Sequence, residues 1–178
     1  FKPMKKLDKT KKIGICTTFK SIFFSSAFNS SFKILYDHLS ENYQLNRWRL
    51  NFQNYEMHYL GFLYEAIDQL TRAGYEVDIR PHPHENWNGW LQWIKSLKNN
   101  KNISLNRDLN LTDWIDGLSV CITTFSTTTF DCISRNVPTI SLDKLVKDEI
   151  IKLPKNKTPL TGDFSWRPAS LDEMKSLI

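Results

Sequence analysis

Cysteine is scarce in this 178-residue sequence, and its copies are odd in number and far apart, at Cys16, Cys121 and Cys132. Such a set argues against a disulfide framework and against a zinc site, and it suits a reducing cytoplasm. The sequence also lacks an apolar run long enough to cross a bilayer, because Lys20 interrupts the best candidate. A signal-peptide pattern is absent as well. We therefore expect a cytoplasmic protein with no bound metal.

The length of 178 residues is that of one domain and is enough to bury a sizeable core. The first residue is Phe1 rather than Met, and residues 171–178 are typical of a helix that stops early. Both features indicate a piece of a longer polypeptide. We expect a basic tail at residues 1–10, a core at 11–153, and a loop with a C-terminal helix at 154–178.

The formal net charge is +5, and lysines near residues 2–12 and 144–157 contribute much of it. A basic balance suits an anionic partner, although an ordinary solvated lysine tail would give the same balance. The lysines cluster near the ends of the chain and no nucleic-acid motif appears, so we expect no nucleic-acid partner. Peripheral contact with the inner face of the cytoplasmic membrane is compatible with these basic residues.

Helix and strand patterns alternate along the chain. Strands are predicted at 11–18, 75–80, 103–105, 119–123 and 137–141. Helices are predicted at 32–39, 55–73, 87–97, 111–116, 145–151 and from 171 onward, with loops at 51–54, 99–102 and 152–165. The tryptophans of the helix at 87–97 could stack a sugar or base, although core packing is the commoner role of such a stripe. The alternation predicts an α/β fold, a three-layer Rossmann-like sandwich with a mostly parallel sheet.

Two polar segments follow predicted strands in this fold. Arg80-Pro81-His82-Pro83-His84-Glu85 comes after the strand at 75–80, and Ser126-Thr127-Thr128-Thr129 comes after the strand at 119–123. Ligands bind beyond the carboxyl ends of the strands in an open parallel sheet, so both segments should line one cleft. A histidine held between prolines can donate to a phosphate oxygen, and a hydroxyl-rich helix start is typical of a phosphate site.

Simpler interpretations of both segments stay open. Ser126 or Thr127 is a favoured N-cap in any helix. A histidine such as His82, taken alone, is more often structural or exposed than a ligand-binding residue. The residues around His82 do not match the spacing of a structural zinc site. A nucleophilic Cys–His pair is also disfavoured, because Cys121 and Cys132 fall on elements predicted to be buried.

Taken together, RPHP after a strand and CITTFSTTTFDCISRNVPTIS some forty residues later resemble two motifs of a known enzyme family. These are the His-Pro and Ser/Thr motifs of bacterial surface-polysaccharide glycosyltransferases with the GT-B fold. Polysialyltransferases, Kdo-transferring capsule enzymes and teichoic-acid glycerophosphotransferases share the arrangement. The similarity spans about residues 55–143 and corresponds to the C-terminal, donor-binding Rossmann half of that fold.

The resemblance implies a donor site at the two motifs. The phosphate of a CMP- or CDP-linked donor would be held by His82, Ser126 and Thr127, with Thr128 and Arg80 beside them. The donor would be a substrate, no cofactor is expected, and the acceptor would be a glycan or glycolipid of surface (capsule) polysaccharide biosynthesis.

Two positions depart from the family pattern. Asp131 stands near a Glu that often binds ribose in GT-B enzymes, and its side chain is shorter. Asn136 stands where Gly is common, and Asn also accepts a left-handed backbone at a helix end. The catalytic base usually lies in the N-terminal domain, so we expect this fragment to be inactive alone. A Rossmann-like module that binds a nucleotide or phosphate without catalysis is the alternative.

Overall fold

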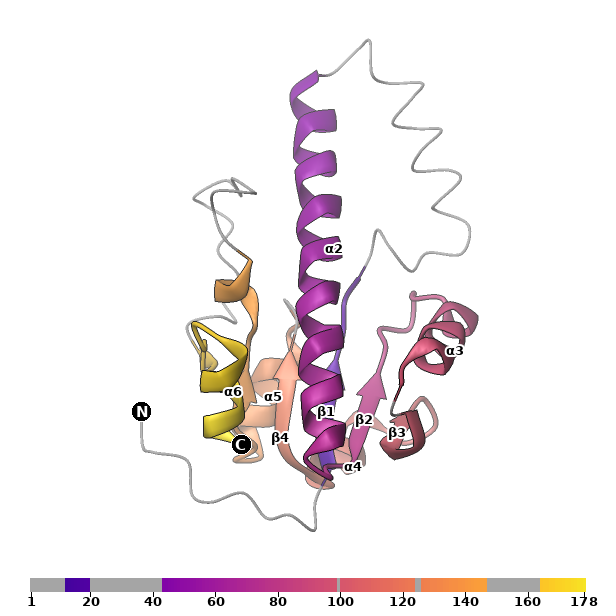
Figure 1. Ribbon diagram of the computed structural model, residues 1–178, viewed down its shortest axis with the longest axis vertical. Coiled ribbons are helices and arrows are strands. Elements are labelled where there is room, and N and C mark those ends of the chain that lie inside the picture. The colour runs from indigo at the N-terminus through magenta and orange to yellow at the C-terminus, as the bar shows by residue number, and fades with distance from the viewer. Residues whose placement is uncertain (1–11, 20–42, 99, 124–125, 147–163) are drawn as a thin grey trace.

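Five parallel strands form a sheet in the order β3-β2-β1-β4-β5 (Figure 1). They are β1 (Lys12–Cys16), β2 (Val77–Arg80), β3 (Ile103–Leu105), β4 (Leu118–Thr123) and β5 (Thr139–Ile140). The computed structural model describes residues 12–19, 43–98, 100–123, 126–146 and 164–178. Every hydrogen-bonded pair of these strands is parallel, which confirms the predicted α/β fold.

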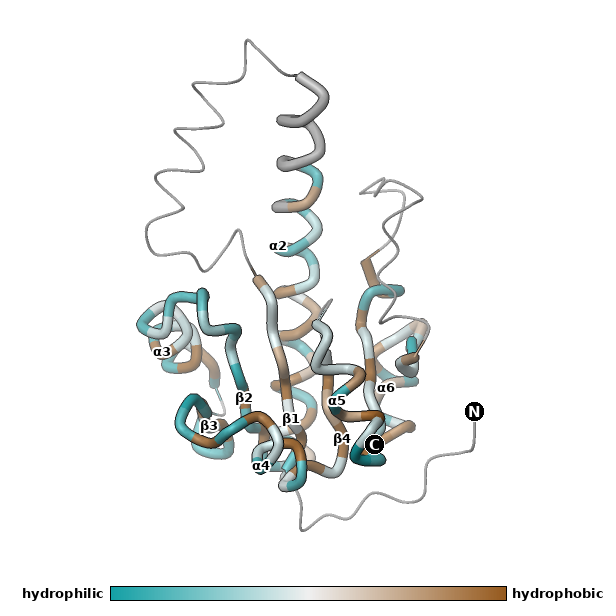
Figure 2. The backbone as a smooth tube through the Cα atoms, turned by 180° about the vertical axis from the view of Figure 1, so that it is seen from behind, coloured by the Kyte–Doolittle hydropathy of each residue, from teal (hydrophilic) through white to brown (hydrophobic). Residues whose placement is uncertain are grey.

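Helices cover both faces of the sheet. They are α2 (Tyr43–Arg72), α3 (Trp87–Ser96), α4 (Leu111–Asp116), α5 (Thr128–Ser134) and α6 (Leu171–Leu177), with 3₁₀ turns η1 (Asn100–Asn102) and η2 (Asp143–Leu145). Figure 1 shows α2 in front of the sheet, and Figure 2 shows the same sheet from behind with α4 and α5 nearer the viewer. The result is the predicted three-layer sandwich.

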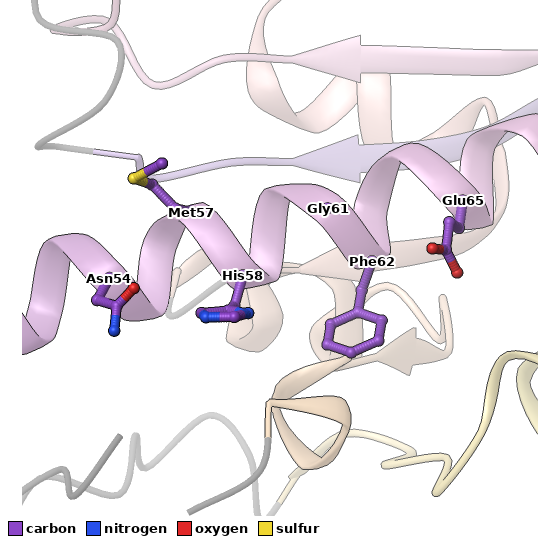
Figure 3. Close-up of a pocket in the computed structure, with 6 residues that line it drawn as sticks. All are labelled: Asn54, Met57, His58, Gly61, Phe62 and Glu65. Carbon is purple, nitrogen blue, oxygen red and sulfur yellow. The ribbon is translucent and has the colours of Figure 1, made fainter. Parts of the chain in front are cut away.

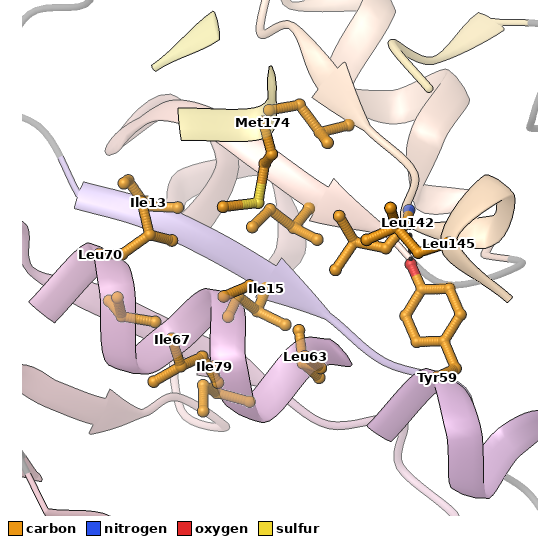
Figure 4. Close-up of a cluster of buried hydrophobic side chains, with 14 of the residues drawn as sticks. Ile13, Ile15, Tyr59, Leu63, Ile67, Leu70, Ile79, Leu142, Leu145 and Met174 are labelled. Carbon is orange, nitrogen blue, oxygen red and sulfur yellow. Dashed lines mark hydrogen bonds between the residues drawn. The ribbon is translucent and has the colours of Figure 1, made fainter. Parts of the chain in front are cut away.

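The side chains of the strands alternate between two buried clusters, as the two-residue period of a strand requires. Ile13 and Ile15 of β1 join the larger cluster, which α2 and α6 complete (Figure 4). Cys16 points to the other face and joins the smaller cluster with Trp114 of α4 and Cys132 of α5. All three cysteines are buried thiols.

Gly14 allows β1 and β4 to lie close together. A Cβ atom built on Gly14 would lie 2.2 Å from Cδ1 of Leu118, which is closer than two carbon atoms can approach. Any larger residue at this position would therefore force Leu118 to move.

Helix α2 begins at Tyr43, twelve residues before the predicted start, so the predicted loop at 51–54 was wrong. Between Tyr43 and Leu60 there is no Gly or Pro to end the helix. Helix growth is cooperative, so it extends outward from the half that packs on the sheet. Figure 1 shows this extension reaching beyond the carboxyl ends of the strands. The predicted stop is confirmed: Gly74 follows the helix with a φ of 85°.

Strands β5 and β2 begin later than predicted because the residues before them belong to helix caps. Val137 donates its N–H to the carbonyl of Cys132, which closes the end of α5 before β5 begins. Tyr75 does the same for α2, by donating to the carbonyl of Leu70. A backbone N–H that completes a helix end cannot also pair with a neighbouring strand.

The remaining predicted elements have mixed outcomes. The strand at 103–105 and the helix at 111–116 are confirmed, and Ser170 caps α6 by accepting the N–H of Glu173 at 3.1 Å. The loop at 99–102 contains η1, and Leu145 ends η2 where a helix was predicted to start. The predicted helix at 32–39, the tail at 1–10, residues 147–151 and most of the loop at 152–165 lie outside the described residues. No helix in the described part of the chain is both long and apolar enough to span a membrane.

Candidate functional site

The candidate site lies at the carboxyl edge of the sheet. In the register of the strands, Cys16 at the end of β1 is opposite Arg80 of β2 on one side and Thr123 of β4 on the other. The segments carrying His82 and Ser126 therefore leave the sheet at the same edge. The strand order reverses between β1 and β4, which is where ligands bind in open parallel sheets.

The turn after β4 is held against β1 by its own hydroxyl groups. Ser126 Oγ donates to Thr128 Oγ1 at 2.9 Å, and the Thr128 N–H donates back to Ser126 Oγ at 3.2 Å. The Cys16 thiol donates to Thr128 Oγ1 at 3.3 Å and lies 3.7 Å from Ser126 Oγ. All three residues are buried. These hydroxyls therefore position the turn, whereas Thr127 between them is exposed.

The N-cap position of α5 belongs to Thr127, but the side chain that caps the helix is that of Ser126, one residue earlier. Thr127 occupies the cap position without a side-chain bond, and Ser126 accepts the first N–H of α5 instead. The N–H groups of Thr129 and Phe130 donate to the carbonyls of Ser126 and Thr127. The first turn of α5 thus uses these N–H groups internally, so a phosphate at this position would rely on other donors.

Cys16 is not a nucleophile at neutral pH. Burial raises the pKa of its thiol, and the hydrogen bonds with Thr128 and Ser126 offset only part of that rise. The thiol therefore stays protonated and serves as a donor within the turn.

The loop after β2 presents His82 in a defined orientation. The N–H of His84 donates to Nδ1 of His82 at 3.2 Å, and the N–H of Glu85 donates to the His82 carbonyl at 2.8 Å. An Nδ1 that accepts a hydrogen bond carries no proton, so the proton of the neutral ring is on Nε2. His82 is half-buried and His84 is exposed.

Glu85 joins this loop to the ends of β1 and α3. Its Oε2 accepts from the Thr17 hydroxyl at 2.8 Å and from Trp90 Nε1 at 2.7 Å, and its Oε1 accepts from the Phe19 N–H at 2.7 Å. The residue is buried, and burial raises the pKa of its carboxyl group against the effect of these bonds. The sequence placed Glu85 only in the segment expected to line the cleft, and this structural role was not predicted. The one sequence feature that could have indicated this structural role is the position of Glu85 between the end of a strand and the start of a helix.

Arg80 and Asp131 have different surroundings from the other predicted site residues. Nη1 of Arg80 donates to the Leu109 carbonyl at 2.8 Å and lies 3.4 Å from Oδ1 of Asn106. The guanidinium carbon lies over the Trp114 ring, 5.7 Å from its centre. Arg80 therefore fastens the loop that follows β3. Asp131 is exposed in the first turn of α5.

A small pocket of about 200 Å³ opens beside the His82 loop. Its walls include Arg80, His82, Trp87, Asn106 and Arg107. Trp87 is the first residue of α3, and the guanidinium of Arg107 lies 5.9 Å from the centre of its ring. The predicted core role of the tryptophan stripe applies to Trp90, which is fully buried, while the half-buried Trp87 faces this pocket.

A larger hollow of about 360 Å³ lies along α2. Figure 3 shows its lining residues, with His58 and Phe62 projecting to the same side of the helix. The described residues that line it all come from α2, so it brings no groups from different elements together. Over the described ranges, no group of three or more His, Cys, Asp or Glu residues is arranged to hold a metal ion.

No protein-family model matches this chain, and no curated protein matches it either. The resemblance to surface-polysaccharide glycosyltransferases therefore rests on the two motifs described above.

Proposed function

We propose that this chain is the donor-binding domain of a transferase that uses a nucleotide-activated donor. One observation carries the proposal. The loop bearing His82 and the turn bearing Thr127 follow the two strands that flank β1, at the edge where the strand order reverses. This is the place where open parallel sheets bind nucleotides.

The chemistry of the edge suits a phosphate group. His82 donates through Nε2, and such a bond to a phosphate is charge-assisted. The exposed hydroxyl of Thr127 adds a second donor. Ser126 and Thr128 support the site indirectly, by holding the turn against Cys16.

The two motifs favour a particular class of donor. In the family that they resemble, the same segments bind cytidine nucleotides, so the proposed donor is a CMP- or CDP-linked sugar or polyol phosphate. The proposed acceptor is a glycan or glycolipid of surface polysaccharide biosynthesis, handled in the cytoplasm at the inner face of the membrane. The chain would require a partner domain for catalysis.

A non-catalytic nucleotide-binding module is the second candidate, and one observation favours it. Glu85, the buried carboxylate of this edge, uses both oxygens for internal hydrogen bonds. It is therefore not poised to act as a general base. Sequencing the gene upstream of this segment distinguishes the two candidate functions, since a second Rossmann domain encoded before it would support the transferase.

Calorimetry with CMP tests the binding proposal. His82→Ala should weaken CMP binding by about 1.5 to 3 kcal/mol, the range for a hydrogen bond to a charged group. His84→Ala is the matched control, because His84 is exposed and belongs to the same loop, and it should leave the affinity nearly unchanged. Equal CMP affinity in the wild type and His82→Ala would refute the assignment of His82.

A further inference from the structure

The pocket beside the His82 loop has an excess of positive charge, because two arginines and one carboxylate line it. Within the described residues, neither Arg80 nor Arg107 forms an ion pair with Asp or Glu. Arg80 donates to a carbonyl and a carboxamide, which fix the guanidinium without cancelling its charge. The carboxylate of Glu85 also lines the pocket, and its oxygens accept from Thr17, Phe19 and Trp90 rather than from either arginine.

The guanidinium of Arg107 is held at the wall of the pocket with donors that can bind an anionic ligand. The guanidinium carbon Cζ of Arg107 lies over the Trp87 ring, 5.9 Å from the ring centre, which is within the range of a cation–π contact. A cation–π contact uses none of the five N–H donors of the guanidinium, so they can still donate to an oxyanion. Arg107 is itself exposed and Trp87 is half-buried. The positive end of α3, which starts at Trp87, adds to the same field.

The size of the pocket limits what it can hold. Its volume of about 200 Å³ is below the roughly 300 to 1,000 Å³ of pockets that enclose whole small molecules. It therefore fits one charged group better than an entire nucleotide.

We propose that the pocket formed by Arg80, His82, Trp87, Asn106 and Arg107 is an oxyanion-binding site, with Arg107 as the residue that determines its affinity. The ligand group is a phosphate, either one belonging to a nucleotide bound at the sheet edge or one on a separate molecule. The inference shares His82 with the proposed function and deepens it, but it requires neither a nucleotide base nor the turn after β4.

The first test is calorimetry of the wild-type chain with inorganic pyrophosphate at low ionic strength. Arg107→Gln should weaken pyrophosphate binding at least tenfold, as expected for the loss of a hydrogen bond between charged groups. Arg72→Gln is the matched control, because it removes the same charge from an exposed arginine at the end of α2. The control should change the affinity less than twofold. Failure of the wild type to bind pyrophosphate, or equal losses in the two variants, would overturn the proposal.

A second arm identifies the source of the phosphate. If CDP binds more tightly than CMP and Arg107→Gln removes the difference, the pocket takes the second phosphate of a nucleotide. If CDP and CMP bind equally while pyrophosphate binding still requires Arg107, the pocket takes a separate anion. Binding of pyrophosphate without any binding of CMP would refute the proposed function and support this site. Binding of CMP, with pyrophosphate binding unaffected by Arg107→Gln, would support the proposed function and refute this site.

Discussion

Replacing Glu85 with Gln tests how the His82 loop is fastened to the sheet. The groups that contact the carboxylate are all donors: the Thr17 hydroxyl, the Phe19 N–H and the Trp90 Nε1–H. A carboxamide has only one oxygen, so its NH₂ group must face one side of this set. The Thr17 hydroxyl can rotate and accept, but neither N–H can. In either orientation one buried N–H loses its acceptor.

The expected cost follows from two opposing effects. A buried donor without an acceptor costs about 1 to 3 kcal/mol. Gln also avoids the burial of a charge, which is the effect that raises the pKa of Glu85. We therefore expect Glu85→Gln to lose about 1 to 2 kcal/mol of unfolding free energy at pH 7. Glu85→Ala removes the carboxylate that accepts from all three donors and should lose about 3 kcal/mol of unfolding free energy. Thr17→Val, which removes one donor and keeps the carboxylate, should lose about 1 kcal/mol.

The pH dependence has a defined sign. Because the folded pKa of Glu85 is raised above its ordinary value of 4.5, the folded state binds the proton more readily than the unfolded state. This contribution to stability is fully present below pH 4.5 and is lost as the pH rises through the folded pKa. A protonated carboxyl can donate to Thr17 and still accept from Trp90 and Phe19, which a carboxamide cannot do. The difference in unfolding free energy between the wild type and Glu85→Gln should therefore grow as the pH falls.

Urea unfolding followed by tryptophan fluorescence at several pH values measures these differences. Acid effects of other groups are common to the wild type and Glu85→Gln, so the difference between them isolates Glu85. A margin that stays constant or shrinks as the pH falls would refute the reasoning. Equal stability of the wild type and Glu85→Ala would refute the structural role itself.

Three further substitutions test the frame around the site by urea unfolding. Tyr59→Phe should lose about 1 to 3 kcal/mol of unfolding free energy, because the buried hydroxyl donates to the carbonyl of Thr123 and accepts the N–H of Leu142. A variant as stable as the wild type would show that these two hydrogen bonds do not stabilise the fold. Gly14→Ala should lose about 1 to 3 kcal/mol through overpacking, and Leu118→Ala in the same chain should recover part of that loss. Asn136→Ala should lose about 1 kcal/mol at its φ of 57°, whereas Asn136→Gly should not; similar losses in both would show that the backbone angle is not the cause.

Periodic elements of the fold could be predicted because their pattern is local. The stripe of Tyr59, Leu63, Ile67 and Leu70 has helical spacing, and the structure buries all four residues against the sheet. The start of α2 could not be predicted in the same way, because residues 43–54 carry no stop signal and no clear stripe. Helix there depends on growth from the packed half, which is a property of the whole element.

The candidate site shows the same division between local and distant information. That His82 follows a strand could be predicted, because Pro81 ends the strand by removing a backbone donor. The bonds of Glu85 to Thr17 and Phe19 could not, because 68 and 66 residues separate the partners. Only the pairing of β1 with β2 brings these residues together.

Most residues of the turn after β4 acquired their roles from tertiary contacts as well. Ser126 and Thr128 could be identified as polar residues at a helix start, but their contact with Cys16 spans more than a hundred positions. Sequence reasoning therefore placed these hydroxyls at a helix start and left open which of them face inward. The burial of Ser126 and Thr128 and the exposure of Thr127 distinguish them.

The central claim is that the carboxyl edge of the sheet binds a nucleotide phosphate next to His82. Imidazole ¹⁵N resonances of the histidines test it most directly, since the sequence contains four histidines and His82→Asn assigns the relevant one. On addition of CMP, we expect the Nε2 resonance of His82 to shift in a saturable way, and cytidine at the same concentration to leave it unchanged. A His82 resonance that does not respond to CMP, or that responds equally to cytidine, would contradict the claim.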